Sequence, residues 1–177
     1  MKQVLGVLAG LTLALAAAEP VQAQDMGGTR SVNFGLAGGL SVPVGDVADG
    51  FKSGYNIVGT VGWQPAARAW GLQFDLGYTN LAEDNGFSDD LSVLSGTGNV
   101  VLTVANNSGI KPYVIGGLGF YNMDAGGDSE TEFGLNGGGG LTFPLGGIST
   151  YVEARFHSIF TEDSNSNYIP IVFGVRF

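Results

Sequence analysis

The segment Tyr168-Ile-Pro-Ile-Val-Phe-Gly-Val-Arg-Phe177 alternates between two kinds of position. Its apolar positions share one parity: Ile169, Ile171, Phe173, Val175 and Phe177. Successive side chains of a strand point to opposite faces, so the pattern predicts a strand with one strongly apolar face. A carboxylate beside Phe177 is costly in a soluble core but tolerated at a membrane edge. We interpret the segment as the closing strand of a membrane β-barrel.

Seven earlier segments show a related pattern: Ser31–Val42, Tyr55–Gln64, Ala69–Asn80, Leu91–Val104, Lys111–Tyr121, Glu132–Phe143 and Ile148–Phe160. Ala69–Asn80 alternates most clearly, whereas the parity of Leu91–Val104 is ambiguous. Lys111–Tyr121 is apolar on both faces and needs the small residues Gly117 and Gly119. Segments of about ten residues with this alternation are typical of outer-membrane strands. The sequence therefore predicts an all-β fold, an eight-stranded antiparallel up-and-down transmembrane β-barrel, acting as a monomer.

The composition fits one exported domain. The chain has 177 residues, of which 13% are charged, and its mean hydropathy is +0.21. The net charge of −9 disfavours nucleic acid as a partner, because phosphates would be repelled. The chain has no cysteine, which excludes thiol catalysis and cysteine-ligated metal.

The first residues have the pattern of an export signal. Lys2 is followed by the apolar run Val4–Ala18, and Val21-Gln22-Ala23 offers small residues where a signal peptidase cuts. The alternative, a transmembrane anchor, is disfavoured because the run is short of the roughly 20 residues that a spanning helix needs. We predict a signal peptide over residues 1–23 and a barrel domain over residues 24–177.

The connections between segments alternate in character. Four are longer and acidic: Pro43–Gly54, Leu81–Asp90, Asn122–Thr131 and Thr161–Asn167. Three are short and turn-like: Pro65–Arg68, Ala105–Ile110 and Pro144–Gly147. Outer-membrane barrels have short periplasmic turns and longer extracellular loops, so the acidic loops are expected outside and both chain ends in the periplasm.

Alternation alone does not separate a membrane barrel from a soluble barrel that binds ligands, since both have one apolar and one polar face. A solvated surface should carry many charges. Here the polar face is mostly Gly, Ser, Asn, Thr and Gln, which suits the narrow interior of an eight-stranded barrel. Aromatic residues near the ends of the apolar band are typical of interfacial girdles: Trp63 and Trp70 at one rim, and Tyr55, Tyr78 and Tyr121 at the other.

Four segments resemble the small outer-membrane β-barrel domain family of the OmpA and OmpX type. They are Asn33–Asp46, Lys111–Phe120, Tyr151–His157 and Ile169–Phe177. The resemblance covers the whole mature chain and implies an outer-membrane location, with membrane lipid and lipopolysaccharide around the barrel. It also implies that the assembly machinery recognises the last strand through Phe173, Val175 and Phe177. The family includes structural anchors, adhesins, narrow channels and a few enzymes, so the resemblance says little about the activity of this protein.

Four polar residues are expected in the lumen: Asp75, Glu153, Arg155 and His157. Charges in a narrow lumen must be paired or hydrated, and Arg155 is the natural partner of Glu153 or Asp75. Such pairs either lock the barrel as a plug or act as the gate of a narrow pathway for ions or small solutes. Both interpretations stay open from the sequence.

Enzyme activity is not predicted. Barrels that deacylate lipid A resemble this architecture and use a His-x-Ser pair with a Glu, whereas here Ile159 stands two residues after His157. Ser158 adjoins His157, but neighbours on a strand face opposite sides. No cofactor or metal site is predicted in the barrel. The leading hypothesis is a structural or surface-interaction role through the acidic loops, whose carboxylates could hold divalent cations.

Overall fold

The computed structural model describes residues 30–65, 68–84, 90–104, 109–126, 128–145, 148–161 and 165–177. The predicted signal peptide lies outside these residues and stays a prediction. Eight strands and one short 3-10 helix, η1, follow one another along the chain: β1 Arg30–Val44, η1 Gly45–Asp49, β2 Phe51–Pro65, β3 Trp70–Glu83, β4 Leu91–Thr103, β5 Lys111–Ala125, β6 Asp128–Leu145, β7 Ile148–Phe160 and β8 Asn165–Arg176.

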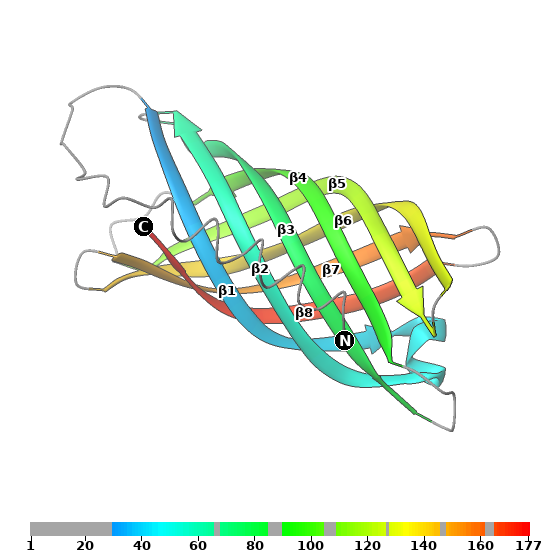
Figure 1. Cartoon of the computed structure of the whole chain (residues 1–177). Helices are drawn as coiled ribbons and strands as arrows, with labels where there is room; N and C mark the ends of the chain where they lie inside the picture. Colours follow the sequence, from blue (N-terminus) through cyan, green and yellow to red (C-terminus); the bar gives the residue numbers. More distant parts are fainter. Residues whose placement is uncertain are drawn as a thin grey trace, which may run out of the picture.

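The strands form a closed barrel in which each strand pairs antiparallel with its neighbours in the chain. β8 closes the barrel on β1, with Gly38 opposite Phe173. Backbone hydrogen bonds of 2.9 Å in both directions between Phe34 and Phe177 extend this seam. The tilted strands and the closure are visible in Figure 1. The predicted eight-stranded up-and-down architecture is confirmed.

The apolar faces point outward. On β3, Phe74 is 63% exposed while its neighbour Asp75 is 8% exposed, and Phe173 on β8 is 57% exposed. The outward residues of β1 from Val32 to Val42 are likewise exposed. A large apolar surface on the outside, with polar residues buried inside, is the inverse of a water-soluble barrel and is what lipid requires. The soluble alternative is thereby excluded. Within the described residues, no helix has the length and hydropathy to cross a bilayer.

The inward glycines of β5 and β6 let neighbouring backbones lie close together. A Cβ atom at Gly117 would overlap the carbonyl oxygen of Gly98, and one at Gly138 would overlap the carbonyl oxygen of Ala154. Only glycine fits such positions without a backbone shift. The expectation that this strand needs a small residue at Gly117 is therefore confirmed. The ambiguous fourth segment, now β4, turns Val93, Ser95 and Thr97 inward.

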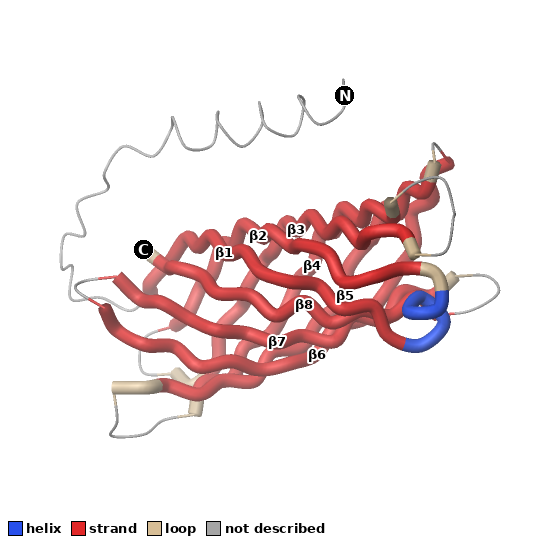
Figure 2. Tube along the Cα trace, turned by 90° about the horizontal axis from the view of Figure 1, so that it is seen from below, coloured by secondary structure: helices blue, strands red, loops and turns tan. Residues whose placement is uncertain are grey.

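The two ends of the barrel differ in charge more than in loop length. We call the end that holds Arg30 and Phe177 the terminal end, and the opposite end, where η1 lies, the acidic end (Figure 2). The prediction of a long loop over Asn122–Thr131 is wrong, because β5 and β6 continue to the pair Ala125 and Asp128. Asn122 Nδ2 donates to Thr131 Oγ1 at 2.9 Å, which ties this extension together beyond the apolar band.

The other predicted acidic loops are also shorter than expected. β1 reaches Val44 and β2 begins at Phe51, so η1 occupies most of the connection. β8 begins at Asn165. Residues 85–89 and 162–164 of the predicted loops, and most of the predicted short turns, lie outside the described residues.

Aromatic pairs lie at both ends of the apolar band. Trp63 and Trp70 make an edge contact with centroids 5.8 Å apart toward the terminal end. Tyr55 and Tyr78 lie 6.1 Å apart toward the acidic end. The expectation that Tyr121 belongs to the same rim is wrong: its side chain is fully buried in the lumen.

Candidate site in the barrel lumen

The strand alternation brings the four predicted lumen residues to the inner face. Asp75 comes from β3, whereas Glu153, Arg155 and His157 come from β7, where they occupy alternate positions. All four side chains are buried. Charged groups removed from solvent in this way need partners, since an isolated buried charge is costly.

Arg155 contacts both carboxylates. Its Nη1 lies 2.7 Å from Asp75 Oδ2, and its Nε donates to Glu153 Oε1 at 3.0 Å. Nη2 also donates to Glu153 Oε1. The guanidinium therefore forms charge-assisted hydrogen bonds to strands on different sides of the lumen, the stronger class of hydrogen bond in proteins.

Neutral side chains complete the hydrogen bonding of the two carboxylates. Asp75 accepts hydrogen bonds from Gln73 Nε2 and Asn99 Nδ2, each at 3.0 Å. Glu153 Oε2 accepts one from the Tyr113 hydroxyl at 2.8 Å. Both oxygens of each carboxylate are thus hydrogen-bonded, and a buried charge with its bonds satisfied is held in one arrangement.

A second cation closes the network. Arg176 Nη2 donates to Gln73 Oε1 at 3.2 Å, and the guanidinium lies over the Tyr151 ring at 4.2 Å and the Tyr113 ring at 5.3 Å. These cation–π contacts stabilise Arg176 beside the interior. The two arginines balance the two carboxylates, and contacts run in a ring: Arg176, Gln73, Asp75, Arg155, Glu153 and Tyr113. We call this set the charge ring.

His157 lies apart from the ion pairs, between two tyrosines. Its Nδ1 and the Tyr121 hydroxyl share a hydrogen bond of 2.9 Å, and its ring stacks on Tyr168 with centroids 4.8 Å apart. Ser158 is on the opposite strand face. His157 is thus held between two aromatic side chains of the lumen.

Apolar residues fill the lumen between this histidine and the acidic end. Tyr121 and Tyr168 pack with Leu81, Leu91, Val93 and Ile159 in one buried cluster. Val47 of η1 and Phe51 at the start of β2 pack against it from the acidic end. We call this set the aromatic plug.

A small cavity lies between the two layers. A cavity of about 30 Å³ is lined by Asp75, Arg155, His157, Ser95 and Asn56, among others. That volume holds about two water molecules. Side chains thus occupy the lumen at two successive levels, as the narrow interior of an eight-stranded barrel allows. Within the described part of the chain, no group of three or more His, Asp or Glu side chains is arranged to hold a metal ion.

Sequence reasoning missed several members of these layers. Gln73 and Arg176 share the polar parity of their segments but are not among the predicted site residues, and neither is Tyr113. The sequence held a signal for Tyr121, because it shares the parity of Gly117 and Gly119, the two small residues that the segment needs.

These features define a class: a closed, internally plugged eight-stranded barrel with a lipid-facing apolar belt. Residues 6–177 match the model of the outer membrane protein beta-barrel domain, and the chain belongs to this family. The protein is thus an outer-membrane β-barrel, as predicted. No curated protein sequence matches the chain significantly.

Solved structures share the fold. Neisserial surface protein A, NspA, is 17% identical with a TM-score of 0.61, covering 83% of this chain and 97% of that one. The N-terminal β-barrel domain of Pseudomonas aeruginosa OprF is 14% identical with a TM-score of 0.51, covering 85% and 100%. The outer membrane enzyme PagL is 21% identical with a TM-score of 0.50, covering 83% and 99%. At these identities the likeness concerns the fold, and the three structures include one named as a surface protein and one named as an enzyme.

Proposed function

We propose that this protein is a non-conducting outer-membrane barrel that acts through its acidic end, as a structural or surface-interaction protein. The contact of Arg155 with both Asp75 and Glu153 carries this proposal, because it bridges the lumen with buried charges whose carboxylate oxygens are all hydrogen-bonded. A lumen blocked in this way leaves the outer ends of the strands as the surfaces that meet other molecules.

The charge distribution supports a role for the acidic end. Carboxylates gather there on η1 and on the strand extensions: Asp46, Asp49, Glu83, Asp84, Asp90, Asp124, Glu130 and Glu132. Lys52, which pairs with Asp84 at 2.8 Å, is the cation at this end among the described residues. A concentrated negative potential attracts cationic partners and divalent ions and speeds their association. With this end outward, the partners would be cationic groups at the cell surface.

A binding measurement tests this proposal. The protein in lipid vesicles should bind fluorescent oligolysine saturably, with an affinity that falls as salt rises. The variant Asp46→Asn/Glu83→Gln/Asp90→Asn/Glu130→Gln should bind it more weakly, because these carboxylates lie at one end. A control variant, Gln64→Ala at the terminal end, should bind as the original protein does. Equal binding by the neutralised variant and the original protein would contradict the proposal.

The second candidate is a narrow gated channel. The 30 Å³ cavity between the charge ring and the aromatic plug favours a channel, since small movements of polar side chains could connect this cavity to both ends of the lumen. Opening would require Arg155 to leave both carboxylates and Tyr121 and Tyr168 to move aside. Bilayer conductance separates the two candidates. An enzymatic role would instead require that His157→Ala abolish a lipid-directed activity.

A further inference from the structure

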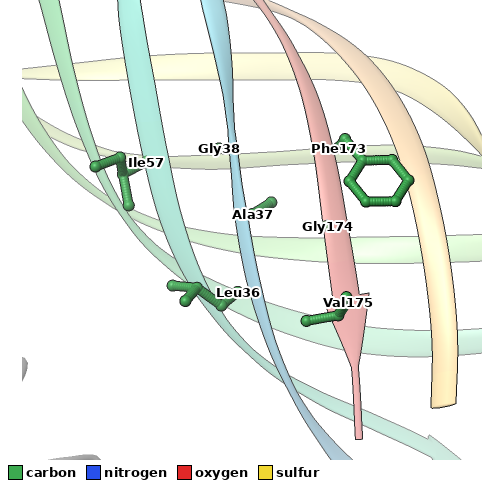
Figure 3. Close-up of a pocket in the computed structure, with 7 residues that line it drawn as sticks. All are labelled: Leu36, Ala37, Gly38, Ile57, Phe173, Gly174 and Val175. Carbon is green, nitrogen blue, oxygen red and sulfur yellow. The ribbon is translucent and has the colours of Figure 1, made fainter.

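A shallow apolar groove of about 300 Å³ lies on the outer surface where β8, β1 and β2 are adjacent (Figure 3). Leu36, Ile57, Phe173 and Val175 form its sides, and Gly38 leaves its floor open. Gly38 lies opposite Ile57 on one side and Phe173 on the other, so its missing side chain creates the hollow. The groove is part of the lipid-facing belt.

The groove lies near the middle of the membrane. The outward apolar residues of β1 run from Val32 to Val42, and Gly38 is close to their midpoint. Six residues separate Val32 from Gly38, which at about 3.3 Å per residue and a tilt near 40° gives roughly 15 Å of height. That is about half of a hydrocarbon core near 30 Å thick. An acyl chain reaching the groove would therefore start at a headgroup near the barrel rim.

An apolar track leads from the groove to the terminal end. Along β2, Gly59 also faces outward, and an added Cβ there would meet nothing within 4 Å. Val61 and Trp63 follow on the same face, and Trp63 packs against Trp70. Tryptophan prefers the interface between chains and headgroups, so this pair marks the headgroup level.

The charge at this rim favours an anionic headgroup. Arg68 is exposed beside the tryptophan pair, and Gln64 Nε2 holds its backbone carbonyl at 2.9 Å. Lys111 is exposed at the same end of the barrel. Among the described residues no Asp or Glu lies at this rim, whereas the opposite end is rich in carboxylates. A lipid phosphate is attracted to the terminal end and repelled by the acidic end.

We infer that this outer face seats one anionic phospholipid, with its phosphate at Arg68 and an acyl chain in the groove at Gly38. With the orientation proposed above, the lipid belongs to the periplasmic leaflet. The site would fix the depth and rotation of the barrel in the membrane, because chain and headgroup contact opposite ends of one track. It makes no use of the lumen, so it is independent of whether the barrel conducts.

The two tryptophans of the chain, Trp63 and Trp70, give a direct readout. Two bilayer mixtures are compared: brominated phosphatidylglycerol with ordinary phosphatidylcholine, and ordinary phosphatidylglycerol with brominated phosphatidylcholine. Bromine quenches tryptophan fluorescence, so the extent of quenching in each mixture measures which lipid occupies the site. At low salt the protein should prefer phosphatidylglycerol about fivefold. Arg68→Ala should remove this preference, whereas Lys52→Ala at the acidic end should keep it. Equal quenching by both lipids, or an unchanged preference in Arg68→Ala, would overturn the inference.

Native mass spectrometry tests the groove. The protein released from nanodiscs containing phosphatidylglycerol should retain one such lipid. Gly38→Leu fills the groove and should lose it. The matched control Gly96→Leu adds the same side chain to an outward position on β4, where nothing lies within 4 Å of the added Cβ, and should keep it. Retention by Gly38→Leu would overturn the inference, as would a protein dimer that Gly38→Leu dissociates, because the groove would then join two copies. Conductance through a protein that still prefers phosphatidylglycerol would contradict only the proposed closed lumen.

Discussion

Arg155 Nη1 lies 2.7 Å from Asp75 Oδ2, although the two residues are 80 positions apart in the chain. The contact joins β7 to β3 across the lumen rather than along the wall of the barrel. Because Arg155 also contacts Glu153, one guanidinium holds together three charges that lipid or an apolar core could not accept separately.

Removing Arg155 should destabilise the barrel strongly. Arg155→Ala leaves Asp75 and Glu153 buried without their shared cation, which costs about 3–5 kcal/mol of unfolding free energy. Urea unfolding in lipid vesicles, followed by tryptophan fluorescence, measures this. The matched control is Lys52→Ala, whose ion pair with Asp84 is largely exposed and is worth at most about 1 kcal/mol. Equal effects of the two substitutions would show that the interior pairs do not stabilise the fold.

The link between Asp75 and Arg155 should appear as an energetic coupling. In a double-mutant cycle, Asp75→Asn and Arg155→Met should each destabilise, and the double variant should be more stable than the sum of the two effects predicts. Residues in direct contact commonly couple by about 0.5–3 kcal/mol. Additive effects would contradict the charge ring as one unit.

The hydrogen bond between Tyr121 and His157 offers a test of the aromatic plug. Tyr121→Phe leaves the buried Nδ1 of His157 without this partner, at a cost of about 1–3 kcal/mol. Replacing both residues in Tyr121→Phe/His157→Phe should recover part of that loss, because the buried Nδ1 that lost its partner is then removed as well. The same urea unfolding experiment compares the variants. A double variant less stable than Tyr121→Phe would show that His157 has another structural role.

The orientation of the strand faces predicts the response to charge at different depths. Phe74→Arg places a cation near the bilayer midplane and should cost about 2–4 kcal/mol. Leu102→Arg lies opposite Trp70, at the rim, and should cost about 0–1 kcal/mol. Folding yield into vesicles and unfolding free energy both report the difference. A harmless Phe74→Arg would mean that this face does not contact lipid.

Much of this fold was predictable from side-chain alternation, because lipid imposes one rule on every outward position. Phe74 and Asp75 show why: a membrane barrel must expose the first and bury the second. This rule does not apply to residues outside the membrane. Beyond the membrane, pairing between backbones can continue through polar sequence, and so β5 and β6 extend through a region predicted as loop.

The site was predictable in its charges but not in its neutral members. Asp75, Glu153 and Arg155 stand out because a charge on an inward parity must find a partner. Tyr113 and Tyr121 do not stand out, because their strand is apolar on both faces. A tyrosine, with an apolar ring and a polar hydroxyl, can lie either in a lumen or at the membrane interface. Whether the charged residues act as a gate depends on motion, which strand parity does not encode.

The central claim is that side chains close the lumen, and planar-bilayer conductance of the purified protein tests it most directly. We predict a current indistinguishable from that of the bare bilayer for the original protein. Tyr121→Ala/Arg155→Ala, which opens both layers, serves as the comparison. Discrete conductance steps in the original protein that Arg155→Ala alters would contradict the closed lumen and establish the channel.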